Sequence, residues 1–163
     1  MRVEGKGLID RSRPISFEFD TIGYKGFAGD TVASAMLASG QRVLGRSFKY
    51  HRPRGVLTAG SEEPNALITV GRGAQAEPNV RATVQEIYED LEVQSQNAWP
   101  SLRTDALAIN DLAWRFLGAG FYYKTFMWPR AFWERLYEPI IRRAAGLGGL
   151  SGRHNEDRYE KAF

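Results

Sequence analysis

The chain has 163 residues, of which 43% are hydrophobic and 12% aromatic, and it carries a formal net charge of +3. These values exclude a disordered chain and suffice for one domain with a hydrophobic core, or for one domain with an appendage. The chain contains no cysteine, which excludes disulfides, zinc ribbons and thiol catalysis. It also has no secretory signal and no apolar run long enough to span a bilayer, so we expect a cytoplasmic protein.

The N-terminal part predicts a β-hairpin followed by a helix. Residues 15–20 alternate apolar and polar side chains, which is typical of a half-buried strand, and residues 22–27 form a second short strand. We expect the next element to be a helix capped by Asp30 or Thr31, because their side-chain oxygens can accept the free N–H groups of its first turn. Gly40 is expected to end this helix.

The middle of the chain predicts further strands. Residues 42–44 suit a short strand, and residues 66–70 form an apolar one. Residues 80–87 are another strand candidate, and residues 91–93 are expected to return as its partner. The order hairpin, helix, further strands is that of an α+β fold of the β-grasp type, in which a mixed sheet curls around one helix.

The C-terminal part changes in composition and predicts a helical, aromatic-rich extension over residues 98–148. Residues 106–117 read as a helix with apolar side chains on one side. An aromatic run over residues 121–128 leads to Pro129, which suits the first position of a second helix with a wide apolar stripe; Pro139 should kink that helix. So many large aromatic residues on a short segment indicate that the extension packs against a larger partner surface.

A basic loop lies between the predicted helix and the apolar strand that follows it. Between Gln41 and Gly60 the chain has five Lys and Arg residues and no acid, which predicts a local positive patch. Such a loop could bind a phosphate, the pyrophosphate of a flavin or dinucleotide, or an acidic partner surface, since arginine gives paired hydrogen bonds to oxyanions; alternatively, its side chains hold the loop itself. The aromatic and basic residues of the loop could also bind nucleic acid, by stacking on bases and contacting phosphates. The acidic strands that follow argue against an extended nucleic-acid-binding surface. The candidate partner- or cofactor-facing residues are Arg46, Lys49, Tyr50, His51, Arg52 and Arg54.

No other motif supports catalysis or metal binding. The glycine-rich stretch 146–152 lacks a glycine that the dinucleotide fingerprint needs, and it follows a helix rather than a strand. The two histidines, His51 and His154, have no partner at metal-ligand spacing. The adjacent acids Glu62 and Glu63 are expected to point apart, and Glu63 before a proline reads as loop geometry. We therefore assign no catalytic or metal-binding residue.

A series of sequence words runs in order along nearly the whole chain. It includes FAGDT (27–31), GRSFKYHRPRG (45–55), EEPNAL (62–67), EPNVRAT (77–83), GFYYKTFMWP (120–129) and AFWE (131–134). This series resembles the N-terminal region of the alpha-subunit family of heterotetrameric sarcosine oxidases. Many words in one order are far more specific than a single short motif.

The resemblance implies a β-grasp domain related to [2Fe–2S] ferredoxins that has lost its cluster, because a ferredoxin loop in this place carries the ligating cysteines. In that family the alpha subunit is several times longer and continues into dinucleotide-binding and folate-binding domains. The holoenzyme also contains beta, gamma and delta subunits. It oxidises sarcosine to glycine with production of hydrogen peroxide and passes the methyl carbon to tetrahydrofolate, using FAD, FMN and NAD. Its sarcosine site and flavin chemistry lie mainly on the beta subunit.

The residues and the resemblance together predict four segments: an N-terminal arm (1–12), a β-grasp, ferredoxin-like domain without a cluster (13–97), a helical extension (98–148) and a linker toward an absent dinucleotide-binding domain (149–163). The expected function is structural and non-catalytic, with the loop over residues 46–60 turned toward cofactor-bearing neighbours. The expected partners are the remaining domains of the alpha subunit and the other subunits, not nucleic acid or a membrane. The alternatives are a free-standing binding module for an acidic protein or nucleic acid, and a small electron carrier, which the missing cysteines oppose.

Overall fold

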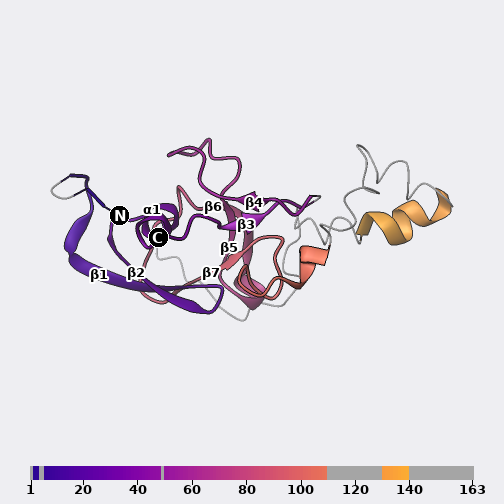
Figure 1. Ribbon diagram of the computed structural model, residues 1–163. Helices are drawn as coiled ribbons and strands as arrows, with labels where there is room; N and C mark the ends of the chain where they lie inside the picture. The colour runs from indigo at the N-terminus through magenta and orange to yellow at the C-terminus, as the bar shows by residue number, and fades with distance from the viewer. Residues whose placement is uncertain (1, 4–5, 49, 110–129, 140–163) are drawn as a thin grey trace, which may run out of the picture.

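The computed structural model describes residues 2–3, 6–48, 50–109 and 130–139. Its centre is a five-stranded sheet in the order β2-β1-β7-β5-β6, with one short α-helix packed on it (Figure 1). The sheet is mixed, because β1 and β7 are parallel whereas the other pairs are antiparallel. The predicted α+β architecture, a curled mixed sheet holding one helix, is confirmed. The strands of this sheet are β1 (Asp10–Phe19), β2 (Ile22–Ala28), β5 (Leu67–Val70), β6 (Glu77–Arg81) and β7 (Leu91–Ser95).

Strands β1 and β2 form the predicted hairpin. Its two-residue turn consists of Asp20 and Thr21, whose φ angles of 49° and 67° both lie in the left-handed region. Such a turn matches the right-handed twist of the strands that it joins. Strand β1 begins at Asp10, ahead of the expected residue 15, and Asp10 already pairs with Ala28.

The α-helix packed on the sheet, α1 (Val32–Ala38), has the ends that the sequence predicts. Thr31 is its N-cap: the Thr31 side chain accepts the N–H of Ser34, and the Ser34 hydroxyl accepts the N–H of Thr31. Two donors that would otherwise be free are thus satisfied by a reciprocal pair. Gly40 follows the last turn with a φ of 86°, a conformation that costs glycine little.

The core lies between α1 and the sheet. Glycine at position 26 on β2 suits the close approach of the two layers, because a Cβ atom there would clash with Cδ1 of Ile87 and lie 3.1 Å from the Cβ of Ala35 on α1. Burial of the apolar side chains from both layers is the main term that stabilises such a domain. The buried apolar residues are Phe17, Phe19, Val32, Ala33, Ala35, Met36, Leu44, Ala66, Ile68, Ala82, Ile87, Leu91 and Val93.

The strand predicted at residues 91–93 exists as β7, but its predicted partner is wrong. Strand β7 lies between β1 and β5, with Phe17 opposite Leu91 in a parallel pair. The strand expected over residues 80–87 ends at Arg81 as β6. Beyond it the backbone turns toward α1, where Ala82 O accepts the N–H of Ala33 and Gln85 O accepts that of Val32.

The chain between α1 and β5 forms a second, two-stranded sheet instead of a strand over residues 42–44. Its strands are β3 (Gly45–Arg46) and β4 (Pro53–Arg54), paired antiparallel. A short 3-10 helix, η1 (Gly73–Gln75), separates β5 from β6.

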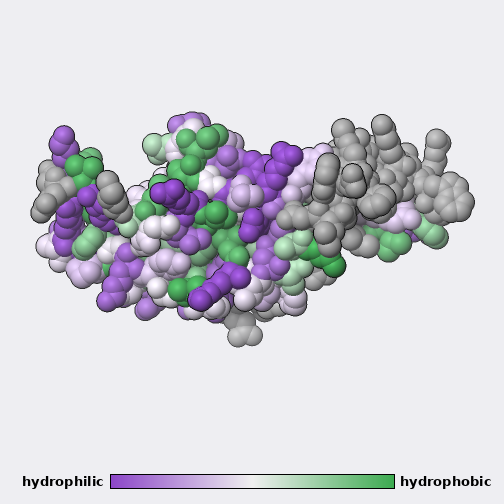
Figure 2. Space-filling model, viewed as in Figure 1, coloured by the Kyte–Doolittle hydropathy of each residue, from purple (hydrophilic) through white to green (hydrophobic). Residues whose placement is uncertain are grey.

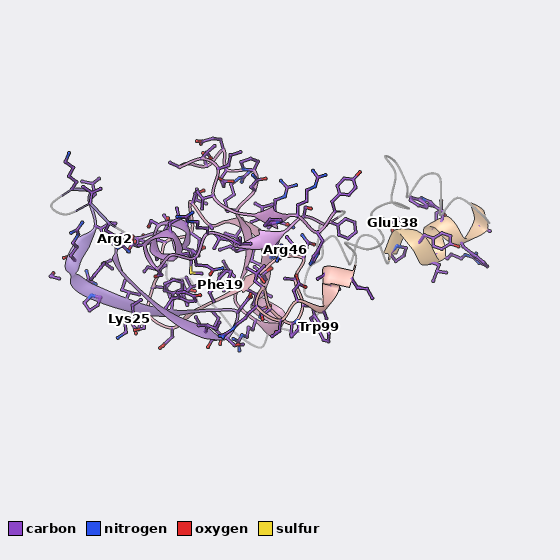
Figure 3. All side chains as sticks on the ribbon, viewed as in Figure 1. Arg2, Phe19, Lys25, Arg46, Trp99 and Glu138 are labelled. Atoms are coloured by element: carbon purple, nitrogen blue, oxygen red, sulfur yellow. The ribbon has the colours of Figure 1, made fainter. Side chains whose placement is uncertain are left out.

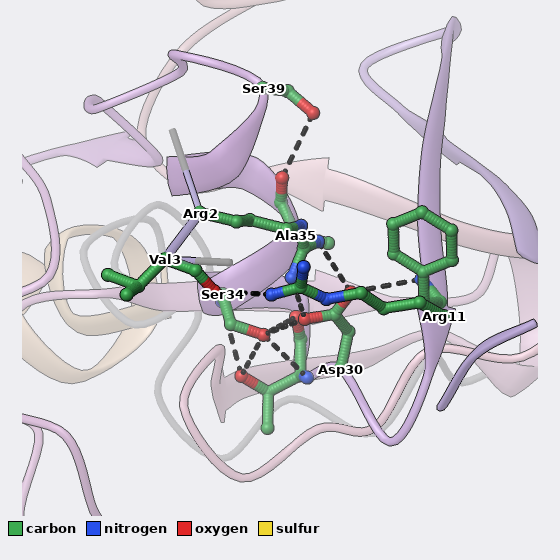
Figure 4. A network of polar contacts seen from close by, with 9 residues as sticks. Arg2, Val3, Arg11, Asp30, Ser34, Ala35 and Ser39 are labelled. Carbon is green, nitrogen blue, oxygen red and sulfur yellow. Dashed lines mark hydrogen bonds and ion pairs between the residues drawn. The ribbon is translucent and has the colours of Figure 1, made fainter. Parts of the chain in front are cut away.

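The N-terminal segment is attached to the helix layer. Arg2 donates from Nη1 and Nη2 to the two carboxylate oxygens of Asp30, at 2.8 and 2.6 Å (Figure 4). Asp30 is fully buried, and it also accepts the Ser34 hydroxyl and the N–H of Phe27. The Arg2 guanidinium lies 5.3 Å from the ring centroid of Phe27, within cation–π range.

After β7 the described residues contain only short helical turns. These are the 3-10 helices η2 (Ala106–Ile109) and η3 (Arg130–Phe132) and the π-helical turn η4 (Trp133–Tyr137). The helix expected over residues 106–117 is thus described only at its start. The aromatic run 121–128, Pro129, the glycine-rich stretch 146–152 and the linker 149–163 lie outside the described residues. Within the described part of the chain, no helix has the length and apolarity needed to cross a bilayer.

Candidate functional site

The basic loop begins with the tight turn between β3 and β4. Ser47 N donates to Arg52 O at 2.8 Å, His51 N donates to Ser47 O at 3.0 Å, and the Ser47 hydroxyl accepts the N–H of Arg52 at 2.9 Å. His51 has a φ of 50° in this turn. Ser47, His51 and Arg52 are therefore held by hydrogen bonds within the turn.

His51 points into the protein rather than to its surface. The residue is 2% exposed, and its Nε2 lies 2.6 Å from Oδ2 of Asp105. The other oxygen of Asp105 accepts the N–H groups of Trp99 and Leu107, each at 3.1 Å. This contact ties the basic loop to the segment after β7. This geometry agrees with the alternative in which loop side chains hold the loop itself. That His51 faces a partner stays a prediction.

Arg46 also faces the interior side of the loop. Its Nε lies 3.6 Å from the same Oδ2 of Asp105, and the side chain is 27% exposed. At that distance the pair is an ion pair and not a hydrogen bond. Arg46 and His51 thus share one carboxylate, which comes from a segment more than fifty residues further along the chain.

The outer side of the loop is formed by Tyr50, Arg52 and Arg54. The Arg52 guanidinium lies 4.9 Å from the ring centroid of Tyr50, a cation–π geometry, and Arg52 is exposed. Arg54 is exposed and donates to the side-chain oxygen of Asn65. On the face drawn in Figure 2, hydrophilic side chains lie on the left and in the centre, with hydrophobic groups between them. Lys49 lies outside the described residues. The five candidates that the structure describes therefore divide into an inward pair, Arg46 and His51, and an outward basic group.

Glu63, which the sequence interpretation treated only as loop geometry, organises the second half of the loop. Its side chain is fully buried, and its carboxylate accepts four backbone N–H groups. Oε2 accepts those of Leu57 (2.7 Å) and Thr58 (2.5 Å), and Oε1 accepts those of Asn65 (2.7 Å) and Ala66 (3.1 Å). The loop is thus folded around one anion.

The same contacts determine the charge of Glu63. Burial raises the pKa of its carboxyl, but the N–H groups of Thr58, Asn65, Leu57 and Ala66 donate to the charged form and outweigh burial, lowering the pKa from 4.5 to about 2. Glu63 is therefore a carboxylate at neutral pH. The four donors lie two to six residues from Glu63, but they converge on its carboxylate only after the loop closes, so the sequence pattern does not single Glu63 out.

These residues do not fit an iron–sulfur cluster. Such clusters are held by cysteine thiolates, and the chain has none. Within the described ranges, no group of three or more His, Cys, Asp or Glu residues could hold a metal ion. The loop N–H groups that could stabilise a bound anion point instead at the Glu63 carboxylate.

Comparisons with known proteins cover nearly the whole chain. The family model described as "2Fe-2S iron-sulfur cluster binding domain" matches residues 12–98. Sarcosine oxidase subunit alpha of Rhizobium meliloti (strain 1021) is 63% identical over 162 residues, which cover 99% of this chain and 16% of that protein. The subunit alpha of Corynebacterium sp. (strain U-96) is 52% identical over 71 residues, 44% of this chain and 7% of that protein. The chain thus spans less than a fifth of the length of these relatives.

A solved structure shows a weaker likeness. The crystal structure of L-proline dehydrogenase from P.horikoshii matches 56% of this chain and 17% of its own chain, with a TM-score of 0.44 and 18% sequence identity.

Proposed function

The chain belongs to the 2Fe-2S iron-sulfur cluster binding domain family, and on this premise we propose that it is a cluster-free, non-catalytic structural region of a sarcosine oxidase alpha subunit. The observation that carries the proposal is the 63% identity to such a subunit over 99% of this chain. Two chains that pack in the same surroundings are expected to stay similar along their whole length, and not only at a few motif positions.

Under this proposal the chain supplies architecture to a complex that oxidises sarcosine to glycine, produces hydrogen peroxide and transfers the methyl carbon to tetrahydrofolate. FAD, FMN, NAD and tetrahydrofolate would be held by the remaining domains of the alpha subunit and by the beta, gamma and delta subunits. The absence of cysteine supports a role without electron transfer through a cluster. So does Glu63, whose buried carboxylate occupies the N–H groups of the loop.

The outward basic group, Tyr50, Arg52 and Arg54, is the proposed contact with the cofactor-bearing neighbours. Arg52 and Arg54 are exposed, and arginine on an aromatic ring is a favoured anchor at protein interfaces. Backbone hydrogen bonds between Ser47, His51 and Arg52 close the turn that presents them, and His51 contacts Asp105. A preorganised cationic face loses little conformational entropy when an acidic surface binds.

The test uses the complete sarcosine oxidase complex that contains this chain. Replacing Arg52→Glu and Arg54→Glu together should weaken assembly or lower the flavin content, measured by size-exclusion chromatography with light scattering and by flavin absorbance. Arg13→Glu is the matched control: it reverses one exposed charge on β1, away from the loop. Normal assembly and full flavin content in the double variant would contradict the proposed orientation of the loop.

A further inference from the structure

A cavity of about 500 Å³ opens beside the β1–β2 turn and has no place in the function proposed above. It lies between the end of β1, the start of β2, the segment from Gln41 to Arg46 and residues 101–103 (Arg46 and Phe19 are labelled in Figure 3). Its volume falls in the range of small-molecule sites, which are concave and mostly apolar with a few placed polar groups.

The apolar part of the cavity is built by Phe19, Ile22, Tyr24 and Leu102. Phe19 and Tyr24 meet edge to face, with ring centroids 6.4 Å apart and planes at 84°. Phe19 is 3% exposed and so has a fixed position in the core, whereas Ile22 is 39% exposed at the mouth. A flat apolar group could therefore lie against this wall and bury further apolar surface.

The polar part of the cavity is supplied by two arginines. The side chain of Arg46 is 27% exposed. Its Nε is buried and faces Asp105 at 3.6 Å, so the donors that Arg46 can offer to the cavity are the terminal nitrogens of its guanidinium. Arg103 is exposed, and in the described part of the chain it forms no ion pair and no side-chain hydrogen bond. The two guanidinium groups therefore bring donors without acceptors to one cavity.

The carboxylates near these arginines are already satisfied. Asp20, which also lines the cavity, accepts the N–H of Ser95 at 2.8 Å and that of Leu102 at 2.9 Å, one on each oxygen. Asp105 is held by His51 and by two backbone N–H groups. The local excess is therefore one of hydrogen-bond donors, and an oxyanion is the ligand group that matches guanidinium donors best.

We propose that this cavity binds a small organic anion, with a flat apolar body against Phe19 and Tyr24 and a phosphate or carboxylate group received by Arg46 and Arg103. The two parts of the site are complementary to the two parts of such a molecule. The inference is independent of any role of the chain in a sarcosine oxidase, because it rests on the cavity alone.

Isothermal titration calorimetry of the full 163-residue chain tests the proposal with phenyl phosphate as the probe. Phenyl phosphate should bind saturably at one site, and phenol and inorganic phosphate, which each carry one half of the molecule, should bind at least tenfold more weakly. Benzoate forms a second arm: binding comparable to that of phenyl phosphate identifies a site for oxyanions in general, and much weaker binding identifies a site for phosphate.

Two variants locate the binding. Arg103→Gln, at an exposed residue without a partner in the described structure, should fold normally and weaken phenyl phosphate binding about tenfold, the loss of a charge-assisted hydrogen bond. Arg46→Gln should weaken it at least as much. Arg81→Gln, on the exposed end of β6, is the matched control and should bind like the unaltered chain. Lack of saturation at millimolar concentrations, equally tight binding of inorganic phosphate, or unchanged binding by folded Arg103→Gln would overturn the proposal.

Discussion

The Nε2 of His51 lies 2.6 Å from Oδ2 of Asp105, and this contact joins the basic loop to the segment that leaves the sheet after β7. The histidine is 2% exposed, so the contact is shielded from water. Asp105 also accepts two backbone N–H groups, those of Trp99 and Leu107. One carboxylate thus satisfies three donors from two parts of the chain, and a buried group of this kind is costly to remove.

Asp105→Ala should lower the free energy of unfolding by about 1–3 kcal/mol, because it leaves the buried His51 without an acceptor and Arg46 without its counter-charge; the N–H groups of Trp99 and Leu107 are exposed and can bond to water instead. Asp105→Asn should cost less, since the amide oxygen can still accept both N–H groups. Urea unfolding followed by far-UV circular dichroism measures both. Glu86→Ala, at an exposed acid whose side chain has no hydrogen bond or ion pair within the described ranges, is the control and should stay within about 0.5 kcal/mol of the unaltered chain. Equal stability of Asp105→Ala and Glu86→Ala would show that the contact is not stabilising.

The parts of the fold that the sequence predicts correctly are those fixed by near neighbours in the chain. The hairpin follows from alternation on either side of Asp20 and Thr21, and the ends of α1 follow from Thr31 and Gly40, which act within one helical turn. The position of β7 could not be predicted in this way. Its parallel pairing, Leu91 opposite Phe17, joins residues from distant parts of the chain, and the hydrophobic pattern alone does not select a partner strand.

The candidate site shows the same division. Composition indicates a basic loop, but it does not separate Arg52, which is exposed, from His51, which is buried. A side chain's direction in a turn depends on the backbone hydrogen bonds that close it. Glu63 and Asp105 were missed because a buried carboxylate is recognised by the donors around it, and these are assembled only in the folded chain.

Glu63→Gln should destabilise the protein strongly although it changes one atom. The amide keeps one acceptor oxygen, so two of the four backbone N–H groups would face an NH₂ group that cannot accept them. The expected loss is about 3 kcal/mol, from two buried donors left unsatisfied. Thermal or urea unfolding measures it, with Glu77→Gln, at an exposed residue at the start of β6, as the control. A loss no larger than that of the control would mean that the loop does not depend on the Glu63 anion.

The protein should lose stability in acid through Glu63. Its pKa is lowered from the ordinary value of 4.5 to about 2, so the unfolded state takes up the proton first as the pH falls. The stabilisation is therefore fully present above about pH 4.5 and is lost as the pH falls toward about 2. Its size is up to about 3 kcal/mol from the shift of the pKa.

Urea unfolding at a series of pH values between neutral and strongly acidic measures this loss. The lowered pKa of Asp30, whose partners Arg2, Ser34 and Phe27 outweigh its burial, acts in the same direction, so the unaltered chain alone does not isolate Glu63. The difference in unfolding free energy between the unaltered chain and Glu63→Gln isolates the contribution of Glu63. It should be largest near neutral pH and shrink below about pH 4.5; a difference that stays constant with pH would show that the carboxyl has an ordinary pKa in the folded protein.

Arg2 should stabilise the fold even though it stands almost at the start of the chain. Its guanidinium makes a two-pronged contact with the buried carboxylate of Asp30, beside the N-terminus of α1. Arg2→Ala should cost about 2 kcal/mol, less than the loss of a fully buried pair, because Arg2 is partly exposed and Asp30 keeps its bonds to Ser34 and Phe27. Arg2→Lys should restore only part of the loss, because a single ammonium cannot reproduce the fork. Lys6→Ala removes an exposed charge from the same segment and should have little effect. Urea unfolding of the three variants measures these effects. Equal stability of Arg2→Ala and Lys6→Ala would show that the contact between Arg2 and Asp30 does not stabilise the fold.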